Sequence, residues 1–252
     1  MKAAKYIFWT FYNIWFYLLV FVFTIIIILP SFIFVVINKG WYKHFYKMGV
    51  LWSDLILLGM GLIPIKNKSP NTIKNHPYIF VANHVSMIDV MLLVSTIRQN
   101  PLVFIGKKEL EKIPIFGFIY KRTMILVDRS SNESKKKVFE ETKNKLNSGI
   151  SLGIFPEGTV PGIEVELAPF KHGAFTMAIE HQVPIVPMTF LDNKKRFPWS
   201  YGGLIGGSKG SPGKLRVKIH DPIHTTGMIK EDRVALSEKV RKIILDDLRN
   251  TK

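Results

Sequence analysis

The longest apolar stretch of the chain lies near its N-terminus, where residues 6–37 contain no charged side chain. As one continuous helix this stretch would be about 50 Å long, whereas the hydrocarbon core of a bilayer is about 30 Å thick. Two membrane geometries therefore stay open. In one, a single span ends or kinks at Pro30 and the remainder lies at the interface. In the other, a short helical hairpin enters one leaflet, and the comparable numbers of lysines on the two flanks slightly favour this hairpin.

Large side chains recur at helical spacing in the segment that follows. This pattern predicts an amphipathic helix suited either to the headgroup layer of a membrane or to the surface of a folded domain. We expect residues 1–65 to form membrane-embedded and interfacial helices and residues 66–252 to form a catalytic domain. Residues 66–71 are expected to be a polar linker between the two. The residues at helical spacing, which form one stripe of the predicted amphipathic helix, are Trp41, Phe45, Met48, Trp52, Leu55 and Gly59.

The rest of the chain alternates short apolar runs with helical patterns. Strands separated by helices of this length predict an α/β fold with a mixed, largely parallel sheet flanked by helices. The glycine-rich residues 202–213 predict a flexible loop, either a lid or a connector. Strands are predicted at residues 78–82, 102–105, 124–127, 151–155, 185–190 and 215–220, and helices at 87–97, 134–146, 174–181 and 231–248.

Composition limits the chemistry and the partners. The 252 residues are 47% hydrophobic, enough for one large domain with an appendage. The chain has no cysteine, so disulfides, thiol nucleophiles and cysteine-ligated zinc are excluded. Its formal net charge of +16 implies an anionic partner such as nucleic acid, anionic lipid or a phosphorylated substrate. The apolar N-terminal stretch favours the membrane among these.

A histidine and an aspartate stand five residues apart directly after the predicted strand 78–82. Residues five apart do not share a helix face, so His84 is expected before the next helix and Asp89 within its first turn. Ser86 and Asp89 fit a capping box with Ser86 at the N-cap. Such a pair can hold one imidazole tautomer, so that the other ring nitrogen faces a substrate hydroxyl. A structural explanation is equally open, in which Asp89 only caps the helix and His84 only forms a hydrogen bond.

Three further polar segments follow this pair in order: residues 106–110 leading to 127–130, residues 155–159, and residues 183–187. Together with residues 83–89 they closely resemble the four motifs of the glycerolipid acyltransferases, in particular the 1-acyl-sn-glycerol-3-phosphate acyltransferases. The resemblance covers about residues 77–190, and members of that family also carry an N-terminal membrane-embedded element. Any one of these motifs is weak, whereas four in order at family-like spacing are specific.

The resemblance implies a catalytic dyad and a set of substrate contacts. His84 would take the proton from a free glycerol hydroxyl that attacks an acyl thioester, and Asp89 would orient the imidazole. Backbone amides of residues 183–187 are expected to stabilise the oxyanion. We expect no metal and no cofactor, because acyl-CoA or acyl carrier protein serves as the donor substrate. The expected substrate-binding residues are Lys107, Arg129, Glu157, Gly158, Thr159 and Lys171.

One departure from the family pattern concerns the acceptor. The family usually has arginine directly after Glu-Gly-Thr, where this chain has Val160 followed by Pro161. An acceptor without a phosphate monoester is therefore an alternative to lysophosphatidic acid. Nearby cations could also replace the missing charge, although a lysine offers a point charge instead of a planar fork. The candidates are Lys107, Lys108, Arg122, Arg129 and Lys171.

The function implied by the resemblance is acyl transfer from acyl-CoA or acyl carrier protein to the sn-2 hydroxyl of 1-acylglycerol-3-phosphate, giving phosphatidic acid. Expected partners are membrane lipids, lysophosphatidic acid and the donor, at the cytoplasmic face of an inner or plasma membrane. Nucleic acid is not expected, because the basic residues form no groove-reading module. A non-catalytic, membrane-anchored lipid-binding protein stays open. So does a lipid hydrolase, although the chain has no Gly-x-Ser-x-Gly elbow.

Overall fold

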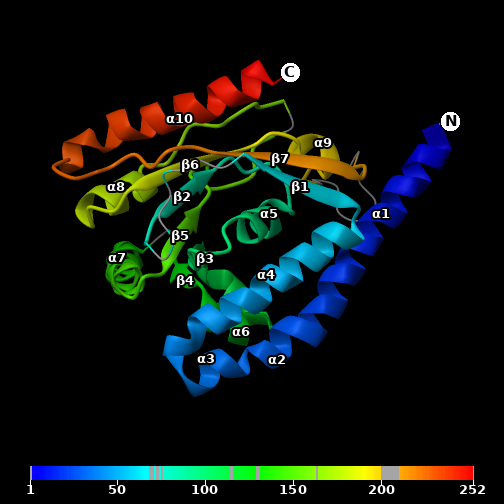
Figure 1. Ribbon diagram of the computed structural model, residues 1–252, viewed down its shortest axis with the longest axis horizontal. Coiled ribbons are helices and arrows are strands. Elements are labelled where there is room, and N and C mark those ends of the chain that lie inside the picture. The colour runs from blue at the N-terminus through cyan, green and yellow to red at the C-terminus, as the bar shows by residue number, and fades with distance from the viewer. Residues whose placement is uncertain are drawn as a thin grey trace.

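A seven-stranded sheet forms the centre of the protein (Figure 1). The computed structural model describes residues 2–67, 71, 74, 76–113, 116–128, 131–162, 164–199 and 210–251. The strand order is β1-β7-β6-β2-β5-β3-β4, and neighbouring strands are parallel except for β6 and β7. The predicted mixed, largely parallel sheet is confirmed. The strands are β1 (Leu62–Asn67), β2 (Ile79–Ala82), β3 (Leu102–Lys107), β4 (Ile125–Val127), β5 (Ser151–Ile154), β6 (Ile185–Phe190) and β7 (Gly213–Ile219).

Helices cover both faces of the sheet (Figure 1). On one face, α10 packs against β6 and α8, and on the other, α5 packs against α4. Toward the β4 edge α7 lies beside β4 and β5, and α6 connects β3 to β4. Toward the other edge α9 follows β6 and contacts β7. The helices are α4 (Tyr42–Gly59), α5 (Asp89–Thr96), α6 (Phe116–Thr123), α7 (Asn132–Asn147), α8 (Gly173–Glu180), α9 (Asn193–Arg196) and α10 (Arg233–Asn250), with 3-10 turns η3 (Lys108–Lys112) before α6 and η5 (Lys230–Asp232) before α10.

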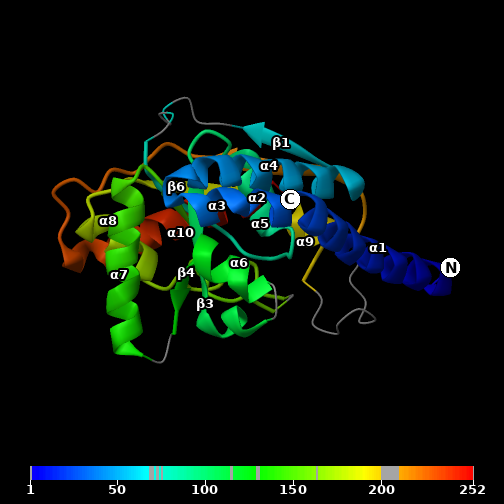
Figure 2. The same ribbon diagram turned by 90° about the horizontal axis from the view of Figure 1, so that it is seen from below.

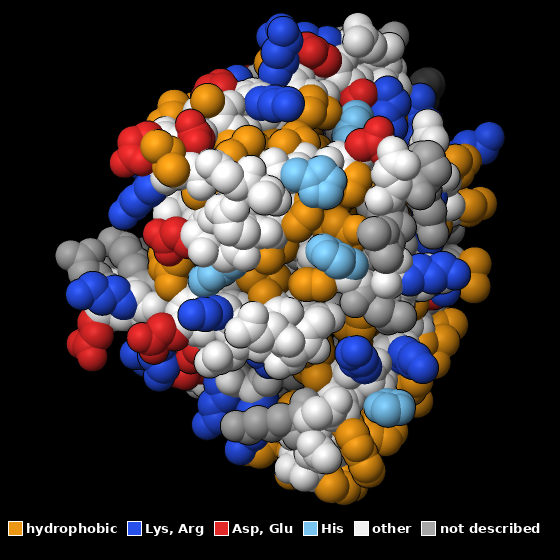
Figure 3. All heavy atoms as spheres, turned by 60° about the vertical axis from the view of Figure 1, so that its left-hand side comes forward, with side chains coloured by type: hydrophobic (Ala, Val, Ile, Leu, Met, Phe, Trp, Pro, Cys, Tyr) orange, Lys and Arg blue, Asp and Glu red, His pale blue; other side chains and the backbone are white. Residues whose placement is uncertain are grey.

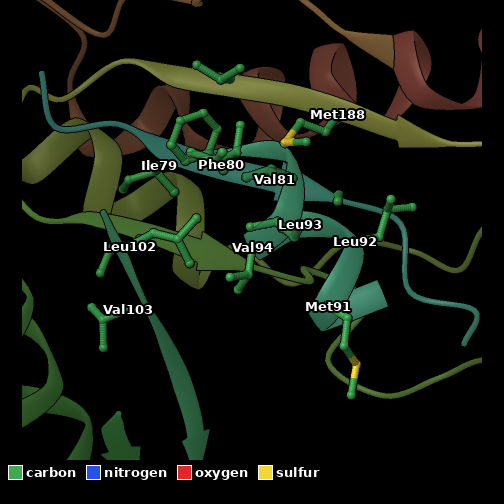
Figure 4. Close-up of a cluster of buried hydrophobic side chains, with 14 of the residues drawn as sticks. Ile79, Phe80, Val81, Met91, Leu92, Leu93, Val94, Leu102, Val103 and Met188 are labelled. Carbon is green, nitrogen blue, oxygen red and sulfur yellow. The ribbon is translucent and has the colours of Figure 1, made fainter. Parts of the chain in front are cut away.

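A cluster of buried hydrophobic side chains includes residues of β2 and α5 (Figure 4). All four β2 side chains are at most 1% exposed, and Leu92 and Leu93 of α5 are fully buried against the sheet. Because apolar groups lie on both faces of β2, its sequence is a continuous hydrophobic run without alternation. The residues that leave its carboxyl end therefore start from a rigid position.

The N-terminal apolar stretch is helical and does not reverse direction within its own length. It runs through α1 (Lys2–Phe23), a π-helical turn η1 (Thr24–Ile28), α2 (Leu29–Ser31) and α3 (Ile33–Ile37). The path bends near Pro30 (Figure 1). Proline has no backbone N–H to donate within the helix, and it comes two residues after the π-helical turn η1, and both features favour a bend. Residues 7–37 are long and apolar enough to cross a membrane, by length and composition. The chain turns back only at η2 (Lys39–Trp41), and α4 then packs against α1, so the hairpin within residues 6–37 is wrong.

Several N-terminal predictions are corrected by the packing. Lys66 and Asn67 belong to β1, which pairs with β7 along its length. The predicted linker 66–71 is therefore wrong at these two residues, and the predicted domain boundary between residues 65 and 66 falls inside a strand. The buried face of α4 is offset from the predicted stripe, because α4 lies between α5 and the N-terminal helices: Trp41 is 42% exposed, whereas Ile56 and Leu57 are buried. The glycine-rich loop lies outside the described residues up to residue 209, and β7 begins at Gly213.

Candidate active site

The residue before His84 holds the end of β2 against β6. Asn83 is 1% exposed, and its Nδ2 donates to the carbonyl of Phe190 at 3.1 Å while its Oδ1 accepts from the Phe190 N–H at 2.8 Å. The side-chain amide thereby extends the β2–β6 hydrogen bonding beyond Ala82. The His84 ring then stacks on the Phe155 ring, with centroids 4.3 Å apart and planes 16° apart. The position and tilt of the imidazole are thus fixed by buried neighbours.

His84 and Asp89 are in direct contact. His84 Nδ1 lies 2.8 Å from Oδ2 of Asp89, which also accepts from the backbone N–H groups of Val85 at 2.6 Å and Ser86 at 2.8 Å. The other carboxylate oxygen accepts from Nδ2 of Asn193 at 2.6 Å. These donors and the N-terminal end of α5 compensate for the burial of a charge that is fully excluded from solvent.

This geometry leaves one imidazole nitrogen for a substrate. A carboxylate accepts and does not donate, so His84 Nδ1 carries the proton in this contact and Nε2 is the available base. The His84 side chain is 19% exposed, whereas that of Asp89 is 0% exposed. A substrate hydroxyl can therefore reach the imidazole but not the carboxylate, which is the arrangement that general-base catalysis requires.

The predicted capping box is formed only in part. The helix begins at Asp89 with Ile88 at the N-cap, two residues later than the predicted N-cap at Ser86. Asp89 accepts from the N–H of Ser86 as a capping box requires, but the Ser86 hydroxyl accepts from Ile88 at 3.2 Å and donates to the carbonyl of Phe197. The hydroxyl therefore ties the segment after β6 to this turn. Asp89 does lie in the first turn of α5, as predicted.

Glu157 lies behind the backbone of His84. It is 4% exposed, and its two oxygens accept from the N–H groups of His84 at 2.8 Å and Ala168 at 2.9 Å. Burial raises the pKa of Glu157, although the two backbone hydrogen bonds oppose that rise. Each Glu157 oxygen accepts one backbone N–H, so Glu157 braces the backbone of His84, and its contact with a substrate stays a prediction.

The other predicted substrate-binding residues are only partly brought together. Gly158 has a φ of +76°, and a Cβ built there would lie 2.8 Å from Nζ of Lys171, so the lysine side chain runs along this glycine. Thr159 is exposed one residue further on, and Lys107 is exposed at the end of β3. Arg129 lies outside the described residues. The structure therefore joins Gly158 and Lys171 beside Glu157.

The fourth predicted motif lies at the wrong end of its strand for an oxyanion site. Parallel pairing sets Ile185 of β6 opposite Ile79 of β2, five positions before His84. The N–H of Ile185 donates to the carbonyl of Ile223 at 3.0 Å, and the prolines at positions 184 and 187 have no N–H. The expectation that amides of residues 183–187 stabilise an oxyanion is therefore wrong, because these residues build the buried strand β6.

Two residues beyond β6 complete the site and were missed from the sequence. Asn193 is fully buried and donates to Asp89, as described above. The Trp199 ring lies edge-on to the His84 ring at 6.3 Å, and the backbone N–H of Trp199 donates to the carbonyl of Val85 at 3.2 Å. A signal for Asn193 was present, since it follows a predicted buried strand within three residues, as Asn83 and His84 do. No sequence pattern singled out Trp199.

Two hollows lie on either side of Pro198 and Trp199. The first is small and mostly apolar, and its lining includes Val85, the residue after His84. Its one cation among the described lining residues is Lys194, whose Nζ donates to the carbonyl of Val165 at 3.0 Å. The second, of about 130 Å³, separates α1 from the His84 turn and is also lined by Asn13, Tyr17, Met87 and Phe197. The other residues that line the first hollow are Val85, Val160, Pro161, Gly162 and Val165.

Comparison with known proteins assigns this site to a family. A family model described as acyltransferase matches residues 64–191, half of the chain. The chain belongs to the acyltransferase family. The part of this acyltransferase that matches runs from β1 to the end of β6, so it contains His84, Asp89 and Glu157.

Named relatives of this acyltransferase occur in plants, fungi and animals. A chloroplastic 1-acyl-sn-glycerol-3-phosphate acyltransferase of Arabidopsis thaliana is 29% identical over 72% of the chain, and the 1-acyl-sn-glycerol-3-phosphate acyltransferase of Saccharomyces cerevisiae is 29% identical over 77% of the chain. The alignments span 49% of the plant protein and 62% of the yeast protein. The chain thus spans about half the length of the plant relative.

The fold of the acyltransferase is also found in a solved structure. The crystal structure of the 1-acyl-sn-glycerophosphate acyltransferase PlsC from Thermotoga maritima superimposes with a TM-score of 0.74, over 100% of this chain and 98% of that chain. The two sequences are 24% identical. The likeness therefore extends to the N-terminal helices as well as to the sheet.

Proposed function

We propose that this acyltransferase moves a fatty acyl group from acyl-CoA or acyl carrier protein to the free sn-2 hydroxyl of 1-acylglycerol-3-phosphate, giving phosphatidic acid. The observation that carries the proposal is the contact between His84 Nδ1 and the buried Asp89 carboxylate at 2.8 Å. Relatives named as 1-acyl-sn-glycerol-3-phosphate acyltransferases support this choice of acceptor.

In the proposed reaction His84 acts as a general base. Its Nε2 accepts the proton of the acceptor hydroxyl while the hydroxyl oxygen attacks the carbonyl carbon of the thioester. Asp89 stabilises the resulting imidazolium without moving, because its carboxylate is already fixed by N–H donors from Val85, Ser86 and Asn193. When the tetrahedral intermediate collapses, the C–S bond breaks and the thiolate leaves with the proton from Nε2. This route needs no acyl-enzyme, which agrees with a chain that lacks cysteine.

The acceptor phosphate is expected to meet lysines near the third motif. Lys171 runs along Gly158, and Lys194 lines the same hollow as Val160, so each can supply charge where Val160 supplies none. A phosphate monoester bound there would lie close to the face of the site that His84 and Trp199 form. A lysolipid without a phosphate monoester is the second candidate acceptor, favoured by the apolar side chains of Val85 and Val165 in that hollow.

The same proposal places the site at a membrane surface. The apolar helical segment Ile7–Ile37 would anchor the protein where lysolipid substrates and the product reside. The formal net charge of +16 suits the anionic cytoplasmic leaflet and an acidic donor carrier. We therefore place the catalytic domain on the cytoplasmic face of an inner or plasma membrane, with membrane lipids as its surroundings.

The test is product analysis with purified full-length protein in nanodiscs, using both thioester donors and a panel of lysolipid acceptors. Loss of the general base in His84→Ala is expected to lower acyl transfer about 10²–10⁴-fold. The matched control is His224→Ala, an exposed histidine far along the chain, which should keep the wild-type rate. Wild-type turnover by His84→Ala would overturn the dyad. Release of free fatty acid without acceptor acylation would indicate a hydrolase, and lipid binding without turnover a non-catalytic protein.

A further inference from the structure

The connection between β3 and β4 exposes an unusual amount of apolar surface. Leu110, Ile113 and Phe118 are 37%, 45% and 47% exposed, respectively. All three lie within nine positions: Leu110 on η3, Ile113 directly after η3 and Phe118 on α6. The other exposed large hydrophobic side chains described beyond residue 66 are Val165, Ile229 and Val234. Single exposed apolar side chains need no explanation, but a cluster indicates a contact surface.

Cations surround these apolar side chains. The Arg122 guanidinium lies 3.8 Å from the centroid of the Phe118 ring, and Lys121 Nζ lies 5.7 Å from it. Within the described part of the chain, no carboxylate lies within ion-pair distance of Lys121 or Arg122. Five cations against the carboxylates of Glu109 and Glu111 leave a positive surface. The cations are Lys107, Lys108, Lys112, Lys121 and Arg122, all exposed, and with Leu110, Ile113 and Phe118 they make up what we call the β3–β4 surface.

The β3–β4 surface is continuous with the N-terminal apolar helices. The Phe118 ring packs edge-on against the Phe32 ring, with centroids 5.4 Å apart. Both ribbon views place α6 beside α2 and α3 (Figures 1 and 2). In the space-filling view, hydrophobic side chains gather along the lower and right-hand edges of the molecule together with lysine and arginine, while acidic side chains lie mainly in the upper and left parts (Figure 3).

The contact with Phe32 sets the depth of this surface in a bilayer. Phe32 precedes Lys39 by seven residues, which corresponds to about 10 Å along a helix axis. Phe118 therefore lies near the level at which the apolar stretch gives way to Lys39 and the 42% exposed Trp41. Lysine, arginine and aromatic side chains are favoured at that level, because an apolar body can enter the acyl region while a charged end stays at the headgroups.

We infer that the β3–β4 surface is a second membrane contact, which rests Leu110, Ile113 and Phe118 on an anionic leaflet beside the N-terminal helices. The inference rests on the membrane insertion of those helices and does not depend on the acyl-transfer reaction. An acidic carrier protein would match the charge equally well. Only a lipid surface also explains why the apolar cluster is continuous with a segment that crosses or enters the bilayer.

The absence of cysteine allows a direct test, since one introduced cysteine gives one labelled site. A fluorescent label is placed by Phe21→Cys, Ile113→Cys or Val234→Cys in full-length protein in nanodiscs of phosphatidylcholine and phosphatidylglycerol, and quenching by a lipid-borne nitroxide is measured. Residue 21 is 64% exposed on α1, and residue 234, 47% exposed on α10 across the sheet, matches residue 113 in exposure. We expect quenching at position 113 to approach that at position 21 and to exceed that at position 234 several-fold.

Charge reversal separates the leaflet from other partners. Lys108→Glu, Lys112→Glu and Lys121→Glu together should lower quenching at position 113 without changing it at position 21. The matched triple on α7, Lys136→Glu, Lys137→Glu and Lys143→Glu, should change neither.

Three outcomes would overturn the inference. Quenching at position 113 no greater than at position 234, while position 21 is quenched, would refute this surface alone. No quenching at position 21 would refute both the surface and the membrane insertion of the helices. Shielding of the position 113 label by an acidic acyl carrier protein, with no effect of lipid, would assign the surface to the carrier. None of these results depends on acyl transfer, so the proposed reaction is tested separately by the His84→Ala assay.

Discussion

Asn193 Nδ2 donates a hydrogen bond of 2.6 Å to Oδ1 of Asp89, the carboxylate oxygen that faces away from His84. Both residues are fully buried, and among the described atoms Oδ1 of Asn193 has no partner. The amide is therefore oriented by Asp89. This contact makes the geometry of the dyad depend on the segment after β6, which is 104 residues further along the chain.

Asn193 is expected to act as a positioning residue for the dyad. Asn193→Ala removes a charge-assisted hydrogen bond and should lower kcat about tenfold with little change in KM. Asn193→Asp should lower kcat further, because a second carboxylate beside Asp89 raises the pKa of one of the two carboxyl groups. A protonated Asp89 would stabilise the His84 imidazolium less well. The measurement is kcat and its pH profile for each variant. The surface substitution Asn250→Ala is the control, and a change in KM alone for Asn193→Ala would contradict the positioning role.

Lys194 is expected to bind the acceptor phosphate. Lys194→Met should raise KM for lysophosphatidic acid about tenfold, equivalent to about 1.4 kcal/mol, because one charged contact is lost. KM for a neutral monoacylglycerol should not change. Lys195→Met, on the exposed side of the same short helix, is the matched control. Adding Val160→Arg to Lys194→Met should restore part of the affinity, since both residues line one hollow. An equal rise in KM for both acceptors would contradict this role.

Gly158→Ala is expected to disturb the third motif. The φ of +76° costs an L-residue about 1–2 kcal/mol, and the new Cβ displaces the Lys171 side chain from its position 2.8 Å away. The free energy of unfolding and the activity should both fall. Gly162→Ala in the same loop meets nothing within 4 Å and should change neither. Chemical denaturation and steady-state kinetics measure the two effects, and equal behaviour of the two variants would show that the conformation at residue 158 is not required.

Asp247 is expected to make the docking of α10 sensitive to acid. Burial alone would raise its pKa, but hydrogen bonds from Lys218, Thr189 and His220 hold that pKa below its ordinary value. A lowered folded-state pKa stabilises the protein above the ordinary carboxyl pKa of about 3.9, and this stabilisation is lost as the pH falls through the lower folded-state value. Asp247→Asn should therefore lower Tm at neutral pH and reduce its decline between about pH 5 and pH 2. Parallel Tm curves for the two proteins would contradict this prediction.

The interior strands were predictable from sequence because their signal is local. β2 and β6 are buried on both faces, so their hydrophobic runs are continuous. β1 was missed because it is an edge strand with alternate side chains exposed, so its sequence has no continuous hydrophobic run. Its partner β7 is distant in sequence, so pairing and not composition makes residues 62–67 a strand.

The candidate site, like the sheet, was predictable from sequence only where its contacts are local. His84 and Asp89 were predictable because a strand end, a turn and a helix start place them together within five residues. The brace from Glu157 comes from 73 residues away, and the sequence pattern assigned that carboxylate to the substrate instead. The fourth motif was taken for an oxyanion site, although strand register places it at the opposite end of β6 from His84.

By itself the sequence determined the α/β class, the apolar N-terminal helix and the His84–Asp89 pair, because each depends on periodicity or spacing over a few residues. Only the tertiary structure decided that Glu157 holds the His84 backbone, that Asn193 and Trp199 belong to the site, and that Phe118 reaches Phe32. These contacts depend on strand order and on how helices pack across the sheet. Local sequence does not encode which distant segments will meet, because parallel strands joined by helices bring their ends to a common edge only after the whole sheet has formed.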